Sequence, residues 1–289
     1  MMREEFERLA AEMRPKLHRY CARMTGSAID GEDVVQDALL KAMNAWAALP
    51  SLASPEGWLF RVAHTTALDF LRGRTRREAT HTDQDPDTMA DPADAAERRE
   101  TIAARLHTLT RLQPAQRSAV ILCDMLGYSI QEACDIVGST LPAAKSALQR
   151  GRLRLRKLAK APEDVRPPVL TDAERRRLAQ CVAWFNAHDF DAVRRLLAED
   201  VRLELVNRLR AEGRDKVEPY FHRYAEAEQW RFVPGLVDGR AAMLVFDRHD
   251  PAARPAYFVL IDWRGERIAR IRDFLFARYA LEDADMRAS

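Results

Sequence analysis

The chain has 289 residues, of which 47% are hydrophobic and 31% charged, with a formal net charge of +2. These fractions are typical of a folded globular protein and exclude a fibrous or mostly disordered chain. The length predicts two domains, each able to bury its own core. No run of 18 apolar residues occurs, so neither membrane spanning nor export is predicted.

The cysteines are few and widely spaced. They are Cys21, Cys123, Cys134 and Cys181, and no CxxC motif occurs. Neither a disulfide framework nor a metal site is predicted. We therefore expect a cytoplasmic protein without a metal or another cofactor.

Residues 1–77 are predicted to be helical throughout. Apolar residues recur every three or four positions, as in amphipathic helices. Gly26 and the pair Asp30-Gly31 predict a break, and Ser54-Pro55 predicts a helix start. The expected helices cover about 6–20, 32–46 and 56–74.

The near-neutral total charge hides three segregated segments. Residues 58–77 carry a net charge of +4, residues 78–100 a net charge of −6, and residues 141–160 a net charge of +7. Two basic helices on either side of an acidic linker indicate a polyanion bound at two points. The alternative is a set of solvated helix faces.

Residues 101–160 predict a helix-turn-helix unit. An apolar helix over 118–126 ends at Gly127, and Ser129 with Glu132 forms a capping-box pattern at the start of a short helix, 130–137. A Gly-containing turn and a basic helix from Pro142 to Leu158 follow. An acid-free second helix suits a major groove flanked by phosphates.

Residues 161–171 contain three prolines and predict a second linker. Residues 172–289 change in composition and predict an α+β domain. We expect two helices followed by an antiparallel meander. The helices cover 172–189 and 192–198, and the strands cover 201–206, 230–237, 241–247, 256–263 and 268–276.

Three parts of the chain resemble the extracytoplasmic-function (group 4) sigma factors of bacterial RNA polymerase. Asp30-Gly31-Glu32-Asp33-Val34-Val35-Gln36-Asp37 is similar to the clamp-binding helix of region 2, and Trp58-Leu59-Phe60-Arg61-Val62-Ala63 is similar to its −10 helix. Leu112-Gln113-Pro114 with Gly127-Tyr128-Ser129 is similar to region 4. Residues 172–289 resemble the SnoaL-like cone domains that follow some of these factors.

This resemblance implies a multidomain protein with an all-α region 2 and a helix-turn-helix region 4, followed by an α+β SnoaL-like cone. It would bind the β′ clamp and β flap of core RNA polymerase, recognise the −10 and −35 promoter elements and initiate transcription. The implied parts are 1–77 for region 2, 78–100 for an acidic linker, 101–160 for region 4, 161–171 for a Pro-rich linker and 172–289 for a regulatory domain.

The resemblance also implies roles for individual residues. Contact with polymerase falls to Asp33, Gln36, Asp37 and Lys41. Contact with the −10 element falls to Trp58, Arg61, Thr65, Arg72 and Arg76, although Trp58 and Phe60 could instead belong to the core. Contact with the −35 element falls to Thr140, Ala143, Lys145, Ser146, Gln149 and Arg150, and Arg152 is expected to meet phosphates or water.

The C-terminal part carries weaker signals of chemistry. Its acid–base candidates have no diagnostic spacing, so we expect regulation, through a small ligand or an intramolecular contact, rather than catalysis. These candidates are His188, Asp189, Asp262 and Asp273, with Tyr257 and Trp184 beside them. Two other classes remain open: a ligand-responsive helix-turn-helix regulator, and a SnoaL-like enzyme with a DNA-binding appendage.

Overall fold

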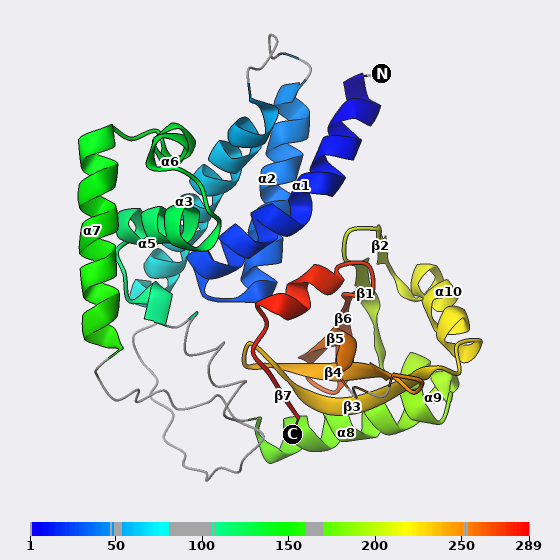
Figure 1. Ribbon diagram of the computed structural model, residues 1–289. Helices are drawn as coiled ribbons and strands as arrows, with labels where there is room; N and C mark the ends of the chain where they lie inside the picture. The colour runs from blue at the N-terminus through cyan, green and yellow to red at the C-terminus, as the bar shows by residue number, and fades with distance from the viewer. Residues whose placement is uncertain are drawn as a thin grey trace. The chain divides into compact units, whose positions relative to one another are not determined.

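The computed structural model describes residues 2–46, 48, 54–80, 106, 108–159, 170–250, 252 and 254–288. The chain divides into two compact units (Figure 1): Met1–Val165 with Glu282–Ala284, and Arg166–Leu281 with Asp285–Ser289. Each unit has its own hydrophobic core. Most of both expected linkers, 81–100 and 161–169, lies outside the described residues.

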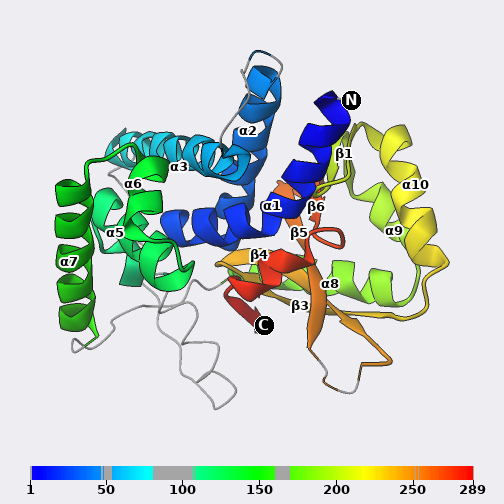
Figure 2. The same ribbon diagram turned by 45° about the horizontal axis from the view of Figure 1, so that its top comes forward.

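The first unit begins with three long helices, α1 (Met2–Thr25), α2 (Ala28–Trp46) and α3 (Pro55–Thr80). The helices α5 (Pro114–Val120), α6 (Ile130–Val137) and α7 (Leu141–Leu158) follow, with a π-helical turn η1 (Ile121–Met125) directly after α5. Figure 2 shows α6 beside α3, and the two helices are in contact. One hydrophobic core therefore joins the segments that resemble regions 2 and 4.

The start of α2 differs from the prediction. Gly26 ends α1 with a φ of +84°, and the Ser27 Oγ accepts the Asp30 N–H at 3.1 Å, which makes Ser27 the N-cap. The break expected at Asp30-Gly31 is therefore wrong, because both residues lie within the helix. A Cβ atom at Gly31 would lie 2.5 Å from the Ala22 nitrogen, so glycine allows α1 and α2 to approach closely. At its other end, α3 continues six residues beyond the expected end near 74.

The helix-turn-helix geometry follows the sequence prediction closely. The Ser129 Oγ accepts the Glu132 N–H at 3.2 Å, and Glu132 Oε2 accepts the Ser129 N–H at 2.8 Å. The capping box is thus confirmed. Gly138 ends α6 with a φ of +67°, a conformation that suits glycine at a helix C-terminus.

The second unit is an α+β domain, as predicted. Its helices are α8 (Asp172–Asn186), α9 (Phe190–Arg195) and α10 (Arg214–Ala225), with a short 3₁₀ helix η2 (Arg278–Glu282) near the end. Its strands are β1 (Leu197–Leu205), β2 (Leu209–Glu212), β3 (Trp230–Val237), β4 (Arg240–Asp247), β5 (Pro255–Arg264), β6 (Arg267–Asp273) and β7 (Met286–Ala288).

The strand order is β2-β1-β6-β5-β4-β3-β7. The strands β3 to β6 form the expected antiparallel meander, but β1 pairs with β6 in parallel, so an entirely antiparallel sheet is wrong. The parallel pair arises because β2 and α10 follow β1, and the chain then crosses toward the opposite edge of the sheet before β3 begins. The expected helix over 192–198 is also shorter, because Leu197 already belongs to β1.

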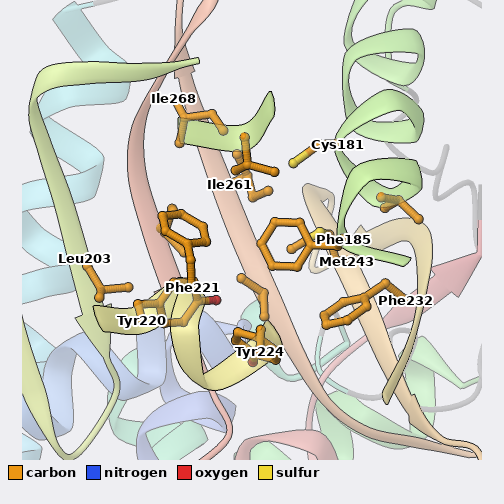
Figure 3. Packing of buried hydrophobic residues seen from close by; sticks show 14 of the residues in the cluster. Cys181, Phe185, Leu203, Tyr220, Phe221, Tyr224, Phe232, Met243, Ile261 and Ile268 are labelled. Carbon is orange, nitrogen blue, oxygen red and sulfur yellow. The ribbon is translucent and has the colours of Figure 1, made fainter. Parts of the chain in front are cut away.

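Aromatic side chains fill the space between these helices and the sheet (Figure 3). Phe185 from α8, Tyr224 from α10 and Phe232 from β3 point toward one another. The Phe185 ring centroid lies 5.0 Å from that of Phe232 and 5.9 Å from that of Tyr224. Such tilted contacts suit the ring quadrupoles and give the domain a close-packed core. None of the described helices is long and apolar enough to cross a membrane.

Candidate nucleic-acid interface

The helix α3 carries the side chains predicted to contact the −10 element. Arg61, Thr65, Arg72 and Arg76 are all exposed. Arg72 pairs with Asp69 at 3.0 Å, but both side chains are more than 60% exposed. An exposed pair of this kind is weak, so the Arg72 guanidinium remains available to a phosphate.

The two aromatic candidates on α3 differ in burial. Phe60 is fully buried, and its ring centroid lies 5.9 Å from that of Tyr20 and 5.2 Å from that of Tyr128. Phe60 is therefore a core residue. Trp58 is half-buried against Trp46, with 6.0 Å between ring centroids, so part of its surface remains exposed.

Arg61 has a partner within the same unit. Its Nε donates to the backbone oxygen of Asp135 at 3.0 Å, and Asp135 belongs to the first helix of the helix-turn-helix. The predicted −10 helix thus holds α6 directly in this arrangement. Thr65 donates its hydroxyl to its own helix, to the backbone oxygens of Arg61 at 3.1 Å and Val62 at 2.9 Å.

The basic helix α7 presents the residues predicted to contact the −35 element. Thr140 is the N-cap residue, and its side chain makes no capping hydrogen bond. Ser146 is half-buried, whereas the others are exposed: Thr140, Ala143, Lys145, Gln149 and Arg150. Their positions around the helix differ, because residues two apart in an α-helix point about 200° apart.

A groove of about 1220 Å³ lies between α3 and the helices α5 to α7. Its floor is apolar and includes Leu68, Leu71 and Val137. Arg72, Arg76 and Arg150 line it as well, and no carboxylate occurs among the described residues that line it. The groove therefore combines an apolar floor with cationic side chains from both predicted DNA-reading helices, a composition that favours an anionic partner.

The residues predicted to bind polymerase lie on α2. Asp33 and Gln36 are half-buried, and Asp37 is exposed. Lys41 is exposed along part of its length, but its Nζ contacts the Thr66 Oγ1 at 3.3 Å, which directs its ammonium group toward α3. The structure thus places Asp33, Gln36 and Asp37 at helical spacing on one face and gives Lys41 a partner inside the unit.

Exposed large apolar side chains mark two places in the described part of the first unit. On α2, Leu40 is 45% exposed and Met43 is 40% exposed. On the second segment, Met125 of the π-helical turn is 44% exposed and Leu153 of α7 is 53% exposed. Sequence reasoning missed all four, although Leu40 and Met43 continue the three- and four-residue spacing of Asp33, Gln36 and Asp37.

A buried arginine joins the two helical segments. Arg117 is only 5% exposed and donates to the backbone oxygens of Leu112 at 3.0 Å, of Thr110 at 2.5 Å, and of Met24 at the end of α1. Burial and the neighbouring charge of Arg74 lower the pKa of Arg117 to about 10. The guanidinium is therefore still charged at neutral pH.

A buried ion pair was also missed. Glu32 is 1% exposed and pairs with Arg14 of α1. The sequence motif places Glu32 among residues similar to the clamp-binding helix, but the structure uses its carboxylate to join α1 and α2. Such a pair is costly to break, because removal of one partner leaves a buried charge.

The C-terminal acid–base candidates are dispersed. The His188 Nδ1 contacts the Ala225 backbone oxygen at 3.2 Å, Asp189 caps α9, and Asp262 is exposed on β5. Trp184 is half-buried. Of these six candidate residues, only Asp273 and Tyr257 belong to one hydrogen-bond network, in which the Tyr224 hydroxyl connects them.

Asp273 lies sealed inside the second unit. Its Oδ2 accepts the Tyr224 hydroxyl at 2.6 Å, and that hydroxyl lies 2.8 Å from the Tyr257 hydroxyl. The Asp273 Oδ1 accepts the Leu275 N–H at 2.8 Å. Burial raises the pKa of Asp273 above its usual range, and the side chain is 1% exposed. The carboxyl therefore belongs to a core network.

Family models match both helical segments of the first unit. The model of Sigma-70 region 2 matches residues 9–77, and the model of Sigma-70 region 4 matches residues 104–155. The first match includes α3, and the second includes α5 and the helix-turn-helix. A helix-turn-helix regulator would account for the second match alone.

The chain is similar in sequence to two curated sigma factors, and one solved structure aligns with it. It is 27% identical to the ECF RNA polymerase sigma factor SigG of Mycobacterium tuberculosis, over 98% of this chain and 85% of SigG. It is 31% identical to SigM of the same species, over 54% of this chain and 78% of SigM. The crystal structure of M. tuberculosis SigJ aligns over 92% of this chain and 95% of SigJ, at 22% identity and a TM-score of 0.37. The matches to regions 2 and 4 and to SigM show that the chain belongs to the ECF family of RNA polymerase sigma factors.

Proposed function

We propose that this sigma factor reads the −10 element with the exposed arginines of α3 and the −35 element with the exposed face of α7. A sigma factor binds core RNA polymerase and promoter DNA, and it does so in the cytoplasm. The observation that carries the assignment is the groove, which is lined by Arg72 and Arg76 from α3 and by Arg150 from α7. Guanidinium groups can contact phosphates and guanine edges.

The two reading helices face one another across this groove, so the arrangement does not admit a DNA duplex between them. Arg61 is held by the Asp135 backbone oxygen, and that bond has to break before α3 can separate from α6. We therefore assign the described arrangement to a closed form, which opens when the protein engages polymerase and promoter. Arg61 would then exchange a backbone oxygen for a nucleic-acid partner.

Arg72→Ala tests the −10 assignment. We expect roughly tenfold weaker open-complex formation, because a phosphate loses its cation beside the unpaired strand. The measurement is permanganate reactivity of unpaired thymines together with run-off transcription, using core polymerase and the full-length protein. The matched control is Arg8→Ala, which changes an exposed arginine of α1, outside the proposed DNA surface. Normal thymine reactivity with Arg72→Ala and unchanged core affinity would remove α3 from the proposed DNA surface.

We also propose that polymerase docks on two apolar patches. The first consists of Leu40 and Met43 on α2, and the second of Met125 and Leu153 beside the helix-turn-helix. Contiguous exposed apolar surface is typical of protein interaction sites. The first patch continues the face of Asp33 and Gln36 and would meet the β′ clamp, whereas the second would meet the β flap.

Leu40→Gln tests the first patch. We expect core affinity to fall by about tenfold, because burial of a leucine side chain contributes about 1.5–3 kcal/mol. Fluorescence anisotropy with labelled full-length protein and core polymerase measures the change. Leu209→Gln, on β2 of the second unit, is a control matched in exposure at 48%. Equal affinities of the two variants would contradict the docking site.

The second unit is proposed to regulate the first rather than to catalyse a reaction. Its own core and the burial of Asp273 among tyrosines support a structural use of that carboxyl. Truncation after Lys160 should change transcript levels while promoter choice is preserved. Run-off transcription at matched concentration measures this, and thermal unfolding of the truncated chain shows whether its first unit remains folded. Equal transcript levels from a folded truncated chain would favour a passive or separately enzymatic domain.

A further inference from the structure

The π-helical turn η1 before the helix-turn-helix places one acidic side chain against the basic helix α7. The Leu126 N–H donates to the Ile121 oxygen at 3.0 Å, five residues back, where an α-helix would bond four residues back. One extra residue per turn shifts every later side chain around the axis. Asp124 lies within this turn.

Asp124 forms a two-point ion pair with Arg152 of α7. The Arg152 Nε donates to Asp124 Oδ2 at 2.9 Å, and Nη2 donates to Oδ1 at 2.5 Å. The planar guanidinium matches a carboxylate in this geometry, which fixes orientation as well as distance. Within the described part of the chain, Arg152 is the one basic side chain of α7 that forms an ion pair.

The neighbours of Arg152 define how α7 is seated. Gly151 is buried, and a Cβ atom there would lie 2.8 Å from the Val120 Cγ2 and 3.1 Å from the Gln116 oxygen, so α7 approaches α5 closely at this residue. Arg150 lines the groove. Because Arg150 and Arg152 are two residues apart, they point in nearly opposite directions, about 200° around the axis.

We infer that Arg152 is a positioning residue: paired with Asp124, it fixes the rotation of the recognition helix about its close contact at Gly151, and it does not contact promoter phosphate. This inference rests on the proposed role of α7 in reading the −35 element. Ala144, Ala147 and Leu158 of α7 are buried as well and seat this face of the helix. The Asp124–Arg152 pair adds a directional restraint to that apolar packing and fixes the face on which Ala143 and Arg150 lie.

The two possible roles of Arg152 predict opposite results for Asp124→Ala. A positioning pair needs both partners, so Asp124→Ala and Arg152→Ala should each weaken binding of full-length holoenzyme to a −35 promoter duplex, by about threefold to tenfold. The double variant should be no weaker than either single variant. A phosphate contact would instead be released by Asp124→Ala, and binding would stay the same or tighten.

Salt dependence and a charge exchange complete the test. Loss of one phosphate contact lowers the slope of log affinity against log salt by about one, and we expect Arg152→Ala to leave that slope unchanged. The exchanged pair Asp124→Arg/Arg152→Asp should regain most of the lost affinity, although it places an acid on α7. A lowered slope, tighter binding by Asp124→Ala or failure of the exchange would overturn the inference.

Two further variants separate this inference from the proposed function. Arg154→Ala removes the same charge from the same helix at an exposed position that pairs with no carboxylate of the described residues, and it should lack the coupling to Asp124. Arg150→Ala tests whether α7 reads the −35 element at all. If Arg150→Ala leaves promoter binding intact, the proposed function of α7 fails. A coupling free energy between Asp124 and Arg152, measured by unfolding of the single and double variants, would still show that the ion pair forms.

Discussion

Arg117→Met is expected to lower the free energy of unfolding of the first unit by about 3–5 kcal/mol. Methionine has a similar length but no donor, so the backbone oxygens that now accept from Arg117 lose a buried partner. An unsatisfied buried acceptor costs about 1–3 kcal/mol, and Arg117 serves three of them. One of these oxygens lies at the end of α1, and the other two lie in the segment before α5. The substitution therefore removes the hydrogen bonds that connect these two segments.

Urea denaturation followed by circular dichroism measures the effect of Arg117→Met. Arg111→Met, at an exposed arginine six residues earlier, is the matched control and should change the stability by less than about 0.5 kcal/mol. Arg117→Lys keeps the charge but not the planar fork, so it should fall between wild type and Arg117→Met. Equal stabilities of Arg117→Met and Arg111→Met would show that the buried guanidinium does not hold the two segments together.

Local signals predicted much of the helical part. Ser129 with Glu132 predicted a capping box, and Gly138 predicted a turn, because the chemistry of these positions lies within a few residues. The strands β3 to β6 could be predicted for the same reason, because the residue pattern that indicates a strand is local. Asp238-Gly239 joins β3 to β4, and its φ values of +49° and +75° have the sign that type I′ hairpin turns require.

Long-range contacts could not be predicted from such patterns. The burial of Arg117 depends on the backbone oxygen of Met24, 93 residues away in the chain, and no local pattern encodes that contact. The parallel pairing of β1 with β6 joins segments separated by more than 60 residues. The helix α10 was missed although Val217, Tyr220 and Tyr224 have helical spacing, because Pro219 interrupts the pattern.

Two buried histidines should make the first unit sensitive to mild acid. Burial lowers the pKa of His64 to about 4, and its Nδ1 lies 2.7 Å from the Tyr20 hydroxyl. Burial also lowers the pKa of His18 to about 4, aided by the nearby charges of Arg14 and Arg23, although its hydrogen bond to the Ala28 oxygen acts in the opposite direction. Both side chains are therefore neutral in the folded protein at pH 7.

Because the pKa of each histidine is near 6.5 when unfolded and about 4 when folded, the unfolded chain binds more protons between these values. Unfolding free energy should therefore fall as the pH drops from about 6.5 to 4, by up to about 3 kcal/mol for each histidine, and should level off below that range. Urea denaturation at a series of pH values measures the slope of unfolding free energy against pH.

The double variant His18→Gln/His64→Gln replaces both titrating rings with amides, so its slope should be much shallower. His249→Gln changes an 82% exposed side chain and should keep the wild-type slope. Carboxylates titrate alike in all three proteins, so the difference in slope isolates the two rings, and an equally steep loss in the double variant would assign the acid sensitivity to other groups.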